Sequence, residues 1–298
     1  MTVHLLEHAG QAFVPGAAAS TAEVALVTLA VGERYLRGWQ QVARQSWERY
    51  AERHGYDIVA IAHPLDTSPE AQARSVAWQK CLILSQPWSA AYRRIVWVDA
   101  DIVINPAAPP IAAAVPPGRV GGTLNYAQHS PAEHHIRLER TPEGLRPPLD
   151  RAALAASLDA VETAWDDYHR FIYRQFEQLD TPATRIVQTG VLVLEPGPHR
   201  ALLERAYAHV QRTRCYEQHP LSAILLDEGW LHPISPRYNW IFYEACALYY
   251  PPLLDAGGEV PWELFQLAFN VQFHNNAWFL HFAGMEKLFE RIVGLRFG

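Results

Sequence analysis

The chain has 298 residues, of which 49% are hydrophobic, enough apolar material for one large α/β domain or two small ones. Its formal net charge of −6 argues against a nucleic-acid partner, because there is no basic stripe to neutralise phosphates. No run approaches the ~18 apolar residues that a membrane span needs, and the three widely spaced cysteines indicate neither a disulfide framework nor a cysteine-rich metal site, so we expect a cytoplasmic protein.

The first predicted elements alternate between helix and strand. Residues 1–22 are expected to form a loose arm and not a signal peptide, because they lack a basic leader. An apolar, β-branched run at 24–31 predicts a buried strand. Apolar residues recur on one face over 33–54, which predicts a helix that Gly55 ends. The next strand is predicted at 56–61.

A second helix is predicted over 71–91, with an interruption near Pro87, and a third strand at 94–98 with Asp99 at its end. This alternation predicts an α/β fold with a mostly parallel sheet flanked by helices.

Residues 123–184 do not follow the alternation. Their long polar stretch predicts an insertion over the sheet on the acceptor side, since long loops in compact domains are commonly functional. His134 and His135 in this stretch suggest either a second metal site or a solvated loop. The pattern then resumes with a strand at 185–195, helices at about 199–214 and 219–228, a strand at 278–282 and a last helix after Gly284.

Asp99 and Asp101 are the first residues that suggest chemistry. A D-x-D match arises by chance about once in a chain of this length, but here it follows an apolar strand at its carboxyl end, where open α/β sheets place ligands. Two neighbouring carboxylates repel each other unless a cation lies between them, and a hard divalent cation can bridge a diphosphate. The alternative is a strand-end turn with two solvated acids.

Several segments together resemble the GT-A glycosyltransferases, and most closely the retaining galactosyl- and xylosyltransferases and their glycogenin-like relatives. The resemblance begins with Trp78-Gln79-Lys80 and the stretch IVWVDADIVINP at 95–106. It continues in the family's order with QTGVLVL at 188–194, Glu217-Gln218, PRYNW at 236–240 and HFAGMEK at 281–287. These segments cover most of residues 24–290, so the resemblance implies a single GT-A domain over 1–298.

The resemblance implies a metal site made by Asp99, Asp101 and His281, which would hold Mn²⁺ or Mg²⁺. An imidazole beside carboxylates shifts the preference toward Mn²⁺. If Asp101 and His281 share one ion, their ligating atoms should lie no more than about 5–6 Å apart. The alternative for His281 is a core histidine at a strand end.

The resemblance also implies residues that hold the donor diphosphate. Lys287 would reach the diphosphate, and Gly284 would let the backbone approach it, while Lys80 would face the donor. Among the 25 basic residues only Lys80 and Lys287 are lysines, and both fall inside these motifs. Either lysine could instead be an ordinary surface residue.

The remaining implied site residues surround the donor. Thr28, Leu29 and Ala30 would hold the nucleotide base, or belong to the core. Ala100 and Gly190 would lie beside the donor, and Gln188 would face the sugar. Glu217 and Gln218 would contact donor hydroxyls and the far face of the reacting carbon, although Glu217 could instead cap the helix that follows. The catalytic candidates are Gln188, Glu217 and Lys287.

These inferences predict a metal-dependent glycosyltransferase that moves a hexose or pentose from a UDP-sugar to a hydroxyl acceptor, with retention. A sugar-1-phosphate nucleotidyltransferase would need a glycine-rich loop after the first strand, where Val31-Gly32-Glu33-Arg34 has one glycine. A non-catalytic nucleotide-sugar or glycan-binding protein is the other alternative. The last helix, from Met285, could touch a membrane surface weakly or pack on the domain.

Overall fold

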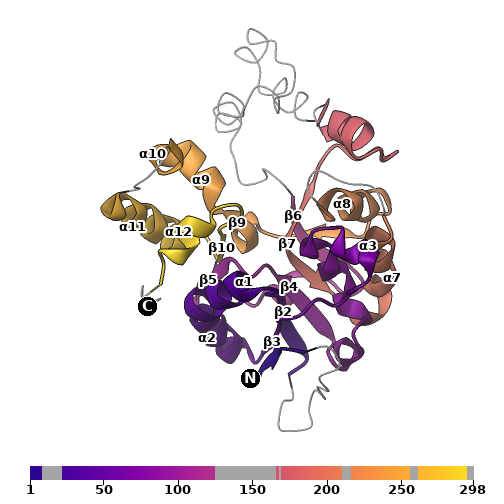
Figure 1. Ribbon diagram of the computed structural model, residues 1–298, viewed down its shortest axis with the longest axis horizontal. Helices are drawn as coiled ribbons and strands as arrows, with labels where there is room; N and C mark the ends of the chain where they lie inside the picture. The colour runs from indigo at the N-terminus through magenta and orange to yellow at the C-terminus, as the bar shows by residue number, and fades with distance from the viewer. Residues whose placement is uncertain (9–21, 125–165, 168, 210–215, 256–260, 294–298) are drawn as a thin grey trace.

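The computed structural model describes residues 1–8, 22–124, 166–167, 169–209, 216–255 and 261–293. Within them the main sheet has seven strands in the order β1-β3-β2-β4-β7-β6-β8 (Figure 1). Strands β1, β3, β2 and β4 are parallel, whereas β7 is antiparallel to both of its neighbours. The strands of this sheet are β1 Val3–Leu6, β2 Val24–Leu29, β3 Asp57–Ile61, β4 Arg94–Val98, β6 Val120–Leu124, β7 Val187–Leu194 and β8 Leu231–Pro233.

Helices cover both faces of this sheet, and the strands are accordingly apolar on both sides. Leu26 and Val96 belong to the core on the face of α1 and α2, while Val27 and Ile95 belong to the core on the face of η2, α7 and α8. Parallel strands buried on two faces read as continuous apolar runs, and the predicted mostly parallel α/β sheet is confirmed. The helical segments are α1 Glu33–Gly38, η1 Trp39–Ala43, α2 Arg44–His54, α3 Pro69–Gln72, η2 Val76–Ser85, η3 Pro87–Ala91, η4 Ile111–Ala114, η6 Ile172–Phe176, α7 Pro196–Tyr207 and α8 Gln218–Asp227.

The strand order creates a crevice beside β2. The chain runs from β2 to β3 across the face of α1 and α2, and from β3 to β4 across the face of η2 and η3. The two connections therefore lie on opposite faces of the sheet, and a pocket opens at the carboxyl ends of β2 and β4. Open α/β sheets bind their ligands at such a position.

A second, three-stranded sheet begins where β4 ends. It has the order β5-β10-β9, and the residues Asp99-Ala100-Asp101 link β4 of the large sheet to β5 of the small one. Strand β10 is antiparallel to β5 and parallel to β9, and His281 is paired with Ile102. The small sheet and the helices near it comprise β5 Ile102–Ile104, η7 Pro236–Asn239, β9 Trp240–Ile241, α9 Phe242–Tyr249, α10 Pro252–Asp255, α11 Trp262–Val271, η8 Gln272–Asn276, β10 Phe279–His281 and α12 Glu286–Glu290.

The expected loose arm is wrong for its first residues. Val3–Leu6 form β1, which pairs in parallel with β3 and covers what would otherwise be the edge of the sheet. The backbone N–H of Thr2 donates to Asp57 Oδ1 at 2.7 Å, which secures the start of this strand. A strand of four residues is too short for its alternation to be recognised. Residues 9–21 of the arm lie outside the described part of the chain.

Other boundaries also differ from the prediction. Residues 123 and 124 of the expected insertion belong to strand β6, and 125–165, with His134 and His135, lie outside the described residues. The helix expected over 71–91 is instead the short α3 followed by the two 3₁₀ segments η2 and η3.

The last helix packs on the domain. Leu288 and Ile292 are buried in the main core, so these side chains do not face a membrane surface. Across the described residues, the helices are all too short or too polar to span a bilayer.

Candidate functional site

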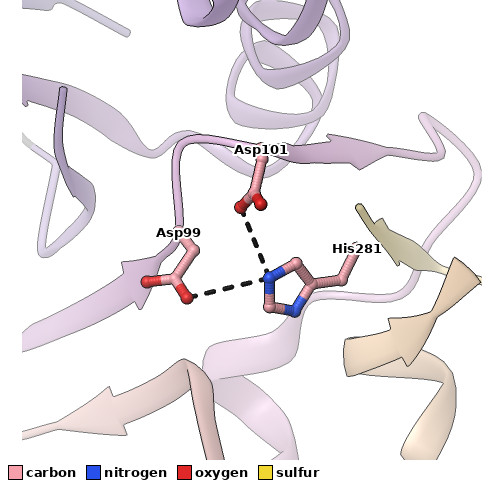
Figure 2. Close-up of side chains that lie close together, drawn as sticks. All are labelled: Asp99, Asp101 and His281. Atoms are coloured by element: carbon pink, nitrogen blue, oxygen red, sulfur yellow. Dashed lines mark ion pairs between the residues drawn. The ribbon is translucent and has the colours of Figure 1, made fainter. Parts of the chain in front are cut away.

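Asp99, Asp101 and His281 come together at the junction of the two sheets. His281 Nε2 lies 3.3 Å from Asp101 Oδ1 and 3.8 Å from Asp99 Oδ2 (Figure 2). One possible ligand atom from each residue lies within 4.8 Å of the others. The expectation that Asp101 and His281 lie within about 5–6 Å of each other is therefore confirmed.

Strand pairing explains this convergence across 180 positions of sequence. Because β10 pairs with β5, the backbone N–H of Phe282 donates to Asp101 O at 3.0 Å, which places His281 beside the D-x-D segment. On the other side β4 pairs with β7, and the backbone N–H of Asp99 donates to Gly190 O at 2.8 Å. The pairing of β5 with β10 and of β4 with β7 thus brings together three side chains that lie at the ends of β4, β5 and β10.

Gly190 provides the space that His281 occupies. A Cβ atom at this position would lie 2.5 Å from His281 Cε1 and 2.8 Å from His281 Nδ1, closer than real Cβ contacts. It would also lie 3.2 Å from Asp99 Oδ2. Because Gly190 has no side chain, the ring of His281 fits beside it. The sequence predicts that Gly190 lies beside the donor, which is a different role.

The ring orientation of His281 suits a metal ligand. His281 Nδ1 lies 2.8 Å from Asn239 Oδ1, while Asn239 Nδ2 donates to Gln188 O at 3.5 Å. Because the amide of Asn239 presents its oxygen to the ring, Nδ1 carries the proton and Nε2 faces the two carboxylates. A metal-binding histidine is commonly oriented by a hydrogen bond at its other nitrogen in this way.

The two carboxylates make the surroundings of the His281 ring electronegative. Burial by itself lowers the pKa of His281, but the carboxylates of Asp101 and Asp99 together outweigh burial and leave the pKa above its ordinary value. Burial likewise raises the pKa of Asp101, and the contact with His281 more than reverses that, so the carboxylate is held ionised. Two carboxylates and one imidazole form a donor set that fits a divalent cation such as Mn²⁺.

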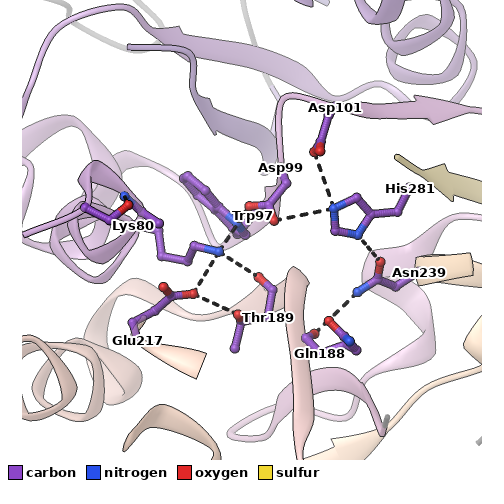
Figure 3. A network of polar contacts seen from close by, with 11 residues as sticks. Lys80, Trp97, Asp99, Asp101, Gln188, Thr189, Glu217, Asn239 and His281 are labelled. Carbon is purple, nitrogen blue, oxygen red and sulfur yellow. Dashed lines mark hydrogen bonds and ion pairs between the residues drawn. The ribbon is translucent and has the colours of Figure 1, made fainter. Parts of the chain in front are cut away.

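Lys80 is buried beside this group and is not a surface lysine. Its Nζ lies 2.9 Å from Glu217 Oε1 and 3.1 Å from Asp99 Oδ1, and it donates to Thr189 O at 3.4 Å (Figure 3). Burial lowers the pKa of Lys80, but the carboxylates of Asp99 and Glu217 outweigh that effect and raise the pKa above its usual value. The ammonium therefore stays charged and links Asp99 to Glu217, the residue that precedes α8.

These contacts also orient Asp99. Trp97 Nε1 donates to Asp99 Oδ1 at 2.8 Å, the same oxygen that Lys80 contacts. Asp99 Oδ2 is the oxygen directed toward His281. One oxygen of Asp99 is thus anchored and the other faces the shared site (Figure 3).

Glu217 is only 2% exposed, and its side chain does not cap helix α8. Instead its Oε1 accepts a hydrogen bond from Thr189 Oγ1 at 2.8 Å and pairs with Lys80. A buried carboxylate with these two partners is a structural ion pair at the edge of the site.

A pocket of about 350 Å³ opens over these residues at the carboxyl ends of β2 and β4. Six of the predicted site residues line it: Leu29, Lys80, Asp99, Ala100, Asp101 and Gly284. The other lining residues were not among the predicted site residues: Val31, Tyr35, Ser75, Val76, Ala77, Trp97, Tyr216 and Glu286.

The remaining predicted site residues do not line this pocket. Thr28 and Ala30 are fully buried in strand β2 and the turn after it, so of this segment Leu29 lines the pocket. Lys287 is exposed on α12, one residue beyond Glu286. Gln188 and Gln218 are both partly buried, and the backbone oxygen of Gln188 supports Asn239.

No protein-family model and no curated protein matches the sequence. Among solved structures, the chain is similar to a glycosyltransferase involved in the glycosylation of the major capsid of PBCV-1, with a TM-score of 0.51 and 12% identity over 90% of this chain and 98% of that chain. It is also similar to the bifunctional glycosyltransferase WbbM, with a TM-score of 0.53 and 11% identity over 92% of this chain and 50% of that one. The chain therefore has the GT-A type of fold found in glycosyltransferases.

Proposed function

We propose that this chain is a metal-dependent glycosyltransferase that moves a hexose or pentose from a UDP-sugar to a hydroxyl acceptor, with retention of configuration. The observation that carries the proposal is the convergence of Asp99, Asp101 and His281 at the carboxyl end of β4, where Asp99 and Asp101 line the pocket. A glycosyltransferase fold and a divalent-cation donor set at the ligand-binding end of the sheet agree with each other.

Different site residues would bind the cation and orient its ligands. Asp99, Asp101 and His281 would hold the cation, which neutralises the leaving diphosphate when it is bound. Lys80 and Trp97 keep one oxygen of Asp99 fixed, so that the carboxylate needs little reorganisation.

A glycine would lie against the diphosphate of the nucleotide, and apolar residues would contact its base. Gly284, at φ 69°, lines the pocket without a side chain and would leave room for the diphosphate. Leu29 and Val31 would contact the base.

The arrangement of acids favours retention. An inverting enzyme needs a carboxylate that is placed to act as a base on the acceptor hydroxyl. Asp99 and Asp101 face His281, and Glu217 is engaged by Lys80 and Thr189. These three carboxylates therefore already have other partners, and Glu286 is the further carboxylate among the described residues that line the pocket.

A screen of UDP-glucose, UDP-galactose and UDP-xylose with Mn²⁺ tests the proposal. At least one donor should be hydrolysed slowly in water or transferred to an added sugar, and NMR of the product should show an α linkage. A β-linked product would contradict retention. Binding without any turnover would favour a non-catalytic nucleotide-sugar-binding protein, and the absence of binding would contradict the proposal as a whole.

We expect the site to prefer UDP to GDP. Leu29, Val31 and Tyr35 provide an apolar surface for a base, and the preference for uridine rests on the resemblance to UDP-sugar-using glycosyltransferases. Calorimetry with UDP and GDP in the presence of Mn²⁺ measures this difference. Tighter binding of GDP would show that the base assignment is wrong.

Lys287→Ala is expected to lower kcat by about 100-fold and to raise KM much less, because an ammonium near the diphosphate gains most as the leaving group acquires charge. Lys287→Arg should restore only part of the rate, since a planar guanidinium differs in geometry. Arg200→Ala removes an exposed cation that does not line the pocket and serves as the control. Wild-type turnover in Lys287→Ala would exclude the residue from catalysis.

A further inference from the structure

Tyr216 is an exposed aromatic residue in the pocket and has no part in the metal group, which consists of Asp99, Asp101 and His281. It lines the same 350 Å³ pocket as Lys80, Asp99 and Asp101, and its exposed fraction is 51%. A large aromatic side chain that is half exposed at the wall of a pocket can offer a flat apolar face to a ligand.

The topology places Tyr216 on the side of the metal group away from Leu29. Strand β4, which leads to Asp99, lies between β2 and β7 in the sheet. Leu29 lies at the end of β2, whereas Glu217 is bound to Thr189 of β7 and directly follows Tyr216. The two pocket walls therefore come from opposite sides of the D-x-D segment.

A nucleotide-sugar has a ring at each end of its diphosphate. If the metal group holds the diphosphate and Leu29 contacts the base, the sugar extends toward β7 and α8. There the ring of Tyr216 can pack against the apolar C–H face of a pyranose. We propose that Tyr216 binds the sugar ring of the donor, an inference that rests on the proposed function.

The backbone of Tyr216 gives independent support. Its φ of 54° lies in the left-handed region, which is unusual for a bulky residue and which glycine adopts without steric cost. Strained conformations of this kind cluster at ligand-binding sites. Among the described residues, Gln178 at φ 52° is the other non-glycine with positive φ, and it does not line the pocket.

Calorimetry with Mn²⁺ and either UDP or a UDP-sugar tests the proposal, using whichever of UDP-glucose, UDP-galactose and UDP-xylose binds the wild type most tightly. Tyr216→Ala should weaken binding of the UDP-sugar by about tenfold, the size of one aromatic ring contact, and change UDP binding by less than about twofold. Tyr216→Phe keeps the ring and should bind both ligands as the wild type does.

Tyr216→Gly separates the ring from the backbone. It should lose the same affinity as Tyr216→Ala but unfold at a higher Tm than that variant, because only glycine relieves the positive φ. Gln178→Gly against Gln178→Ala is the matched control: it should show the same order of Tm values with unchanged affinity for the UDP-sugar.

Three results would overturn the assignment, and they point to different errors. Unchanged binding of the UDP-sugar by Tyr216→Ala would exclude the ring from the donor site while the proposed function stands. Equal weakening of UDP and UDP-sugar would place the ring on the nucleotide instead. If the wild type binds none of the three UDP-sugars, the proposed function fails and this inference fails with it.

Discussion

Gly190→Ala is expected to lower the affinity for Mn²⁺ by about 100-fold, although Gly190 contributes no metal ligand. The added methyl group would lie 2.5 Å from His281 Cε1 and 3.2 Å from Asp99 Oδ2. The ring cannot move away freely, because Asn239 Oδ1 holds its Nδ1 at 2.8 Å. The clash therefore displaces His281 from the two carboxylates, and a titration of Mn²⁺ followed by EPR measures the loss.

Gly121→Ala is the matched control for this variant. A Cβ atom at Gly121 would lie 2.4 Å from Val115 Cγ2, a comparable clash in a neighbouring strand that does not line the pocket. Both variants should lose stability, but Gly121→Ala should keep its affinity for Mn²⁺. If both variants bind Mn²⁺ as the wild type does, Gly190 does not provide the space for His281.

Lys80→Ala is expected to lower the free energy of unfolding by about 3–5 kcal/mol. The substitution leaves the buried Glu217, which is 2% exposed, without its counter-charge and with the hydrogen bond from Thr189, and it removes the cation beside Asp99. A buried carboxylate without its counter-charge is among the costliest defects in a protein interior. Urea unfolding of the metal-free protein measures the effect without a contribution from bound ligand.

The double variant Lys80→Met with Glu217→Gln tests whether the charge pair is the cause. Removing both charges should recover most of the stability lost in Lys80→Ala, because no buried charge is then left unpaired. A loss below about 1 kcal/mol in Lys80→Ala would instead indicate a solvated pair of the kind found at surfaces.

The sequence predicted four strands of the large sheet, β2, β3, β4 and β7, and missed β1, β6 and β8. The runs at β2, β3 and β4 are apolar at all but one residue each, and such runs are easily recognised. The short β1 escaped recognition because four residues carry little pattern, and what holds it in place is the exposed edge of β3, which is a property of the fold.

In the candidate site, too, some features could be predicted from the local sequence and others depend on the fold. Asp99 and Asp101 could be identified from their position after an apolar strand, but their closeness to His281 depends on the register of β5 with β10. The pairing of Lys80 with Glu217 joins residues 137 positions apart, and no local pattern reports it. Tyr216 was not predicted because neither its exposure nor its positive φ can be recognised from the sequence.

The dependence of UDP-sugar turnover on Mn²⁺ concentration, measured for the wild type and for Asp101→Ala, tests the central claim most directly. We expect saturable activation of the wild type, complete loss with excess chelator, and recovery when Mn²⁺ is restored. Asp101→Ala should lose at least about 1,000-fold in rate at every Mn²⁺ concentration, because a Lewis-acid site without a ligand cannot stabilise the leaving diphosphate. Turnover that persists in chelator, or that Asp101→Ala retains, would contradict a shared metal site at Asp99, Asp101 and His281.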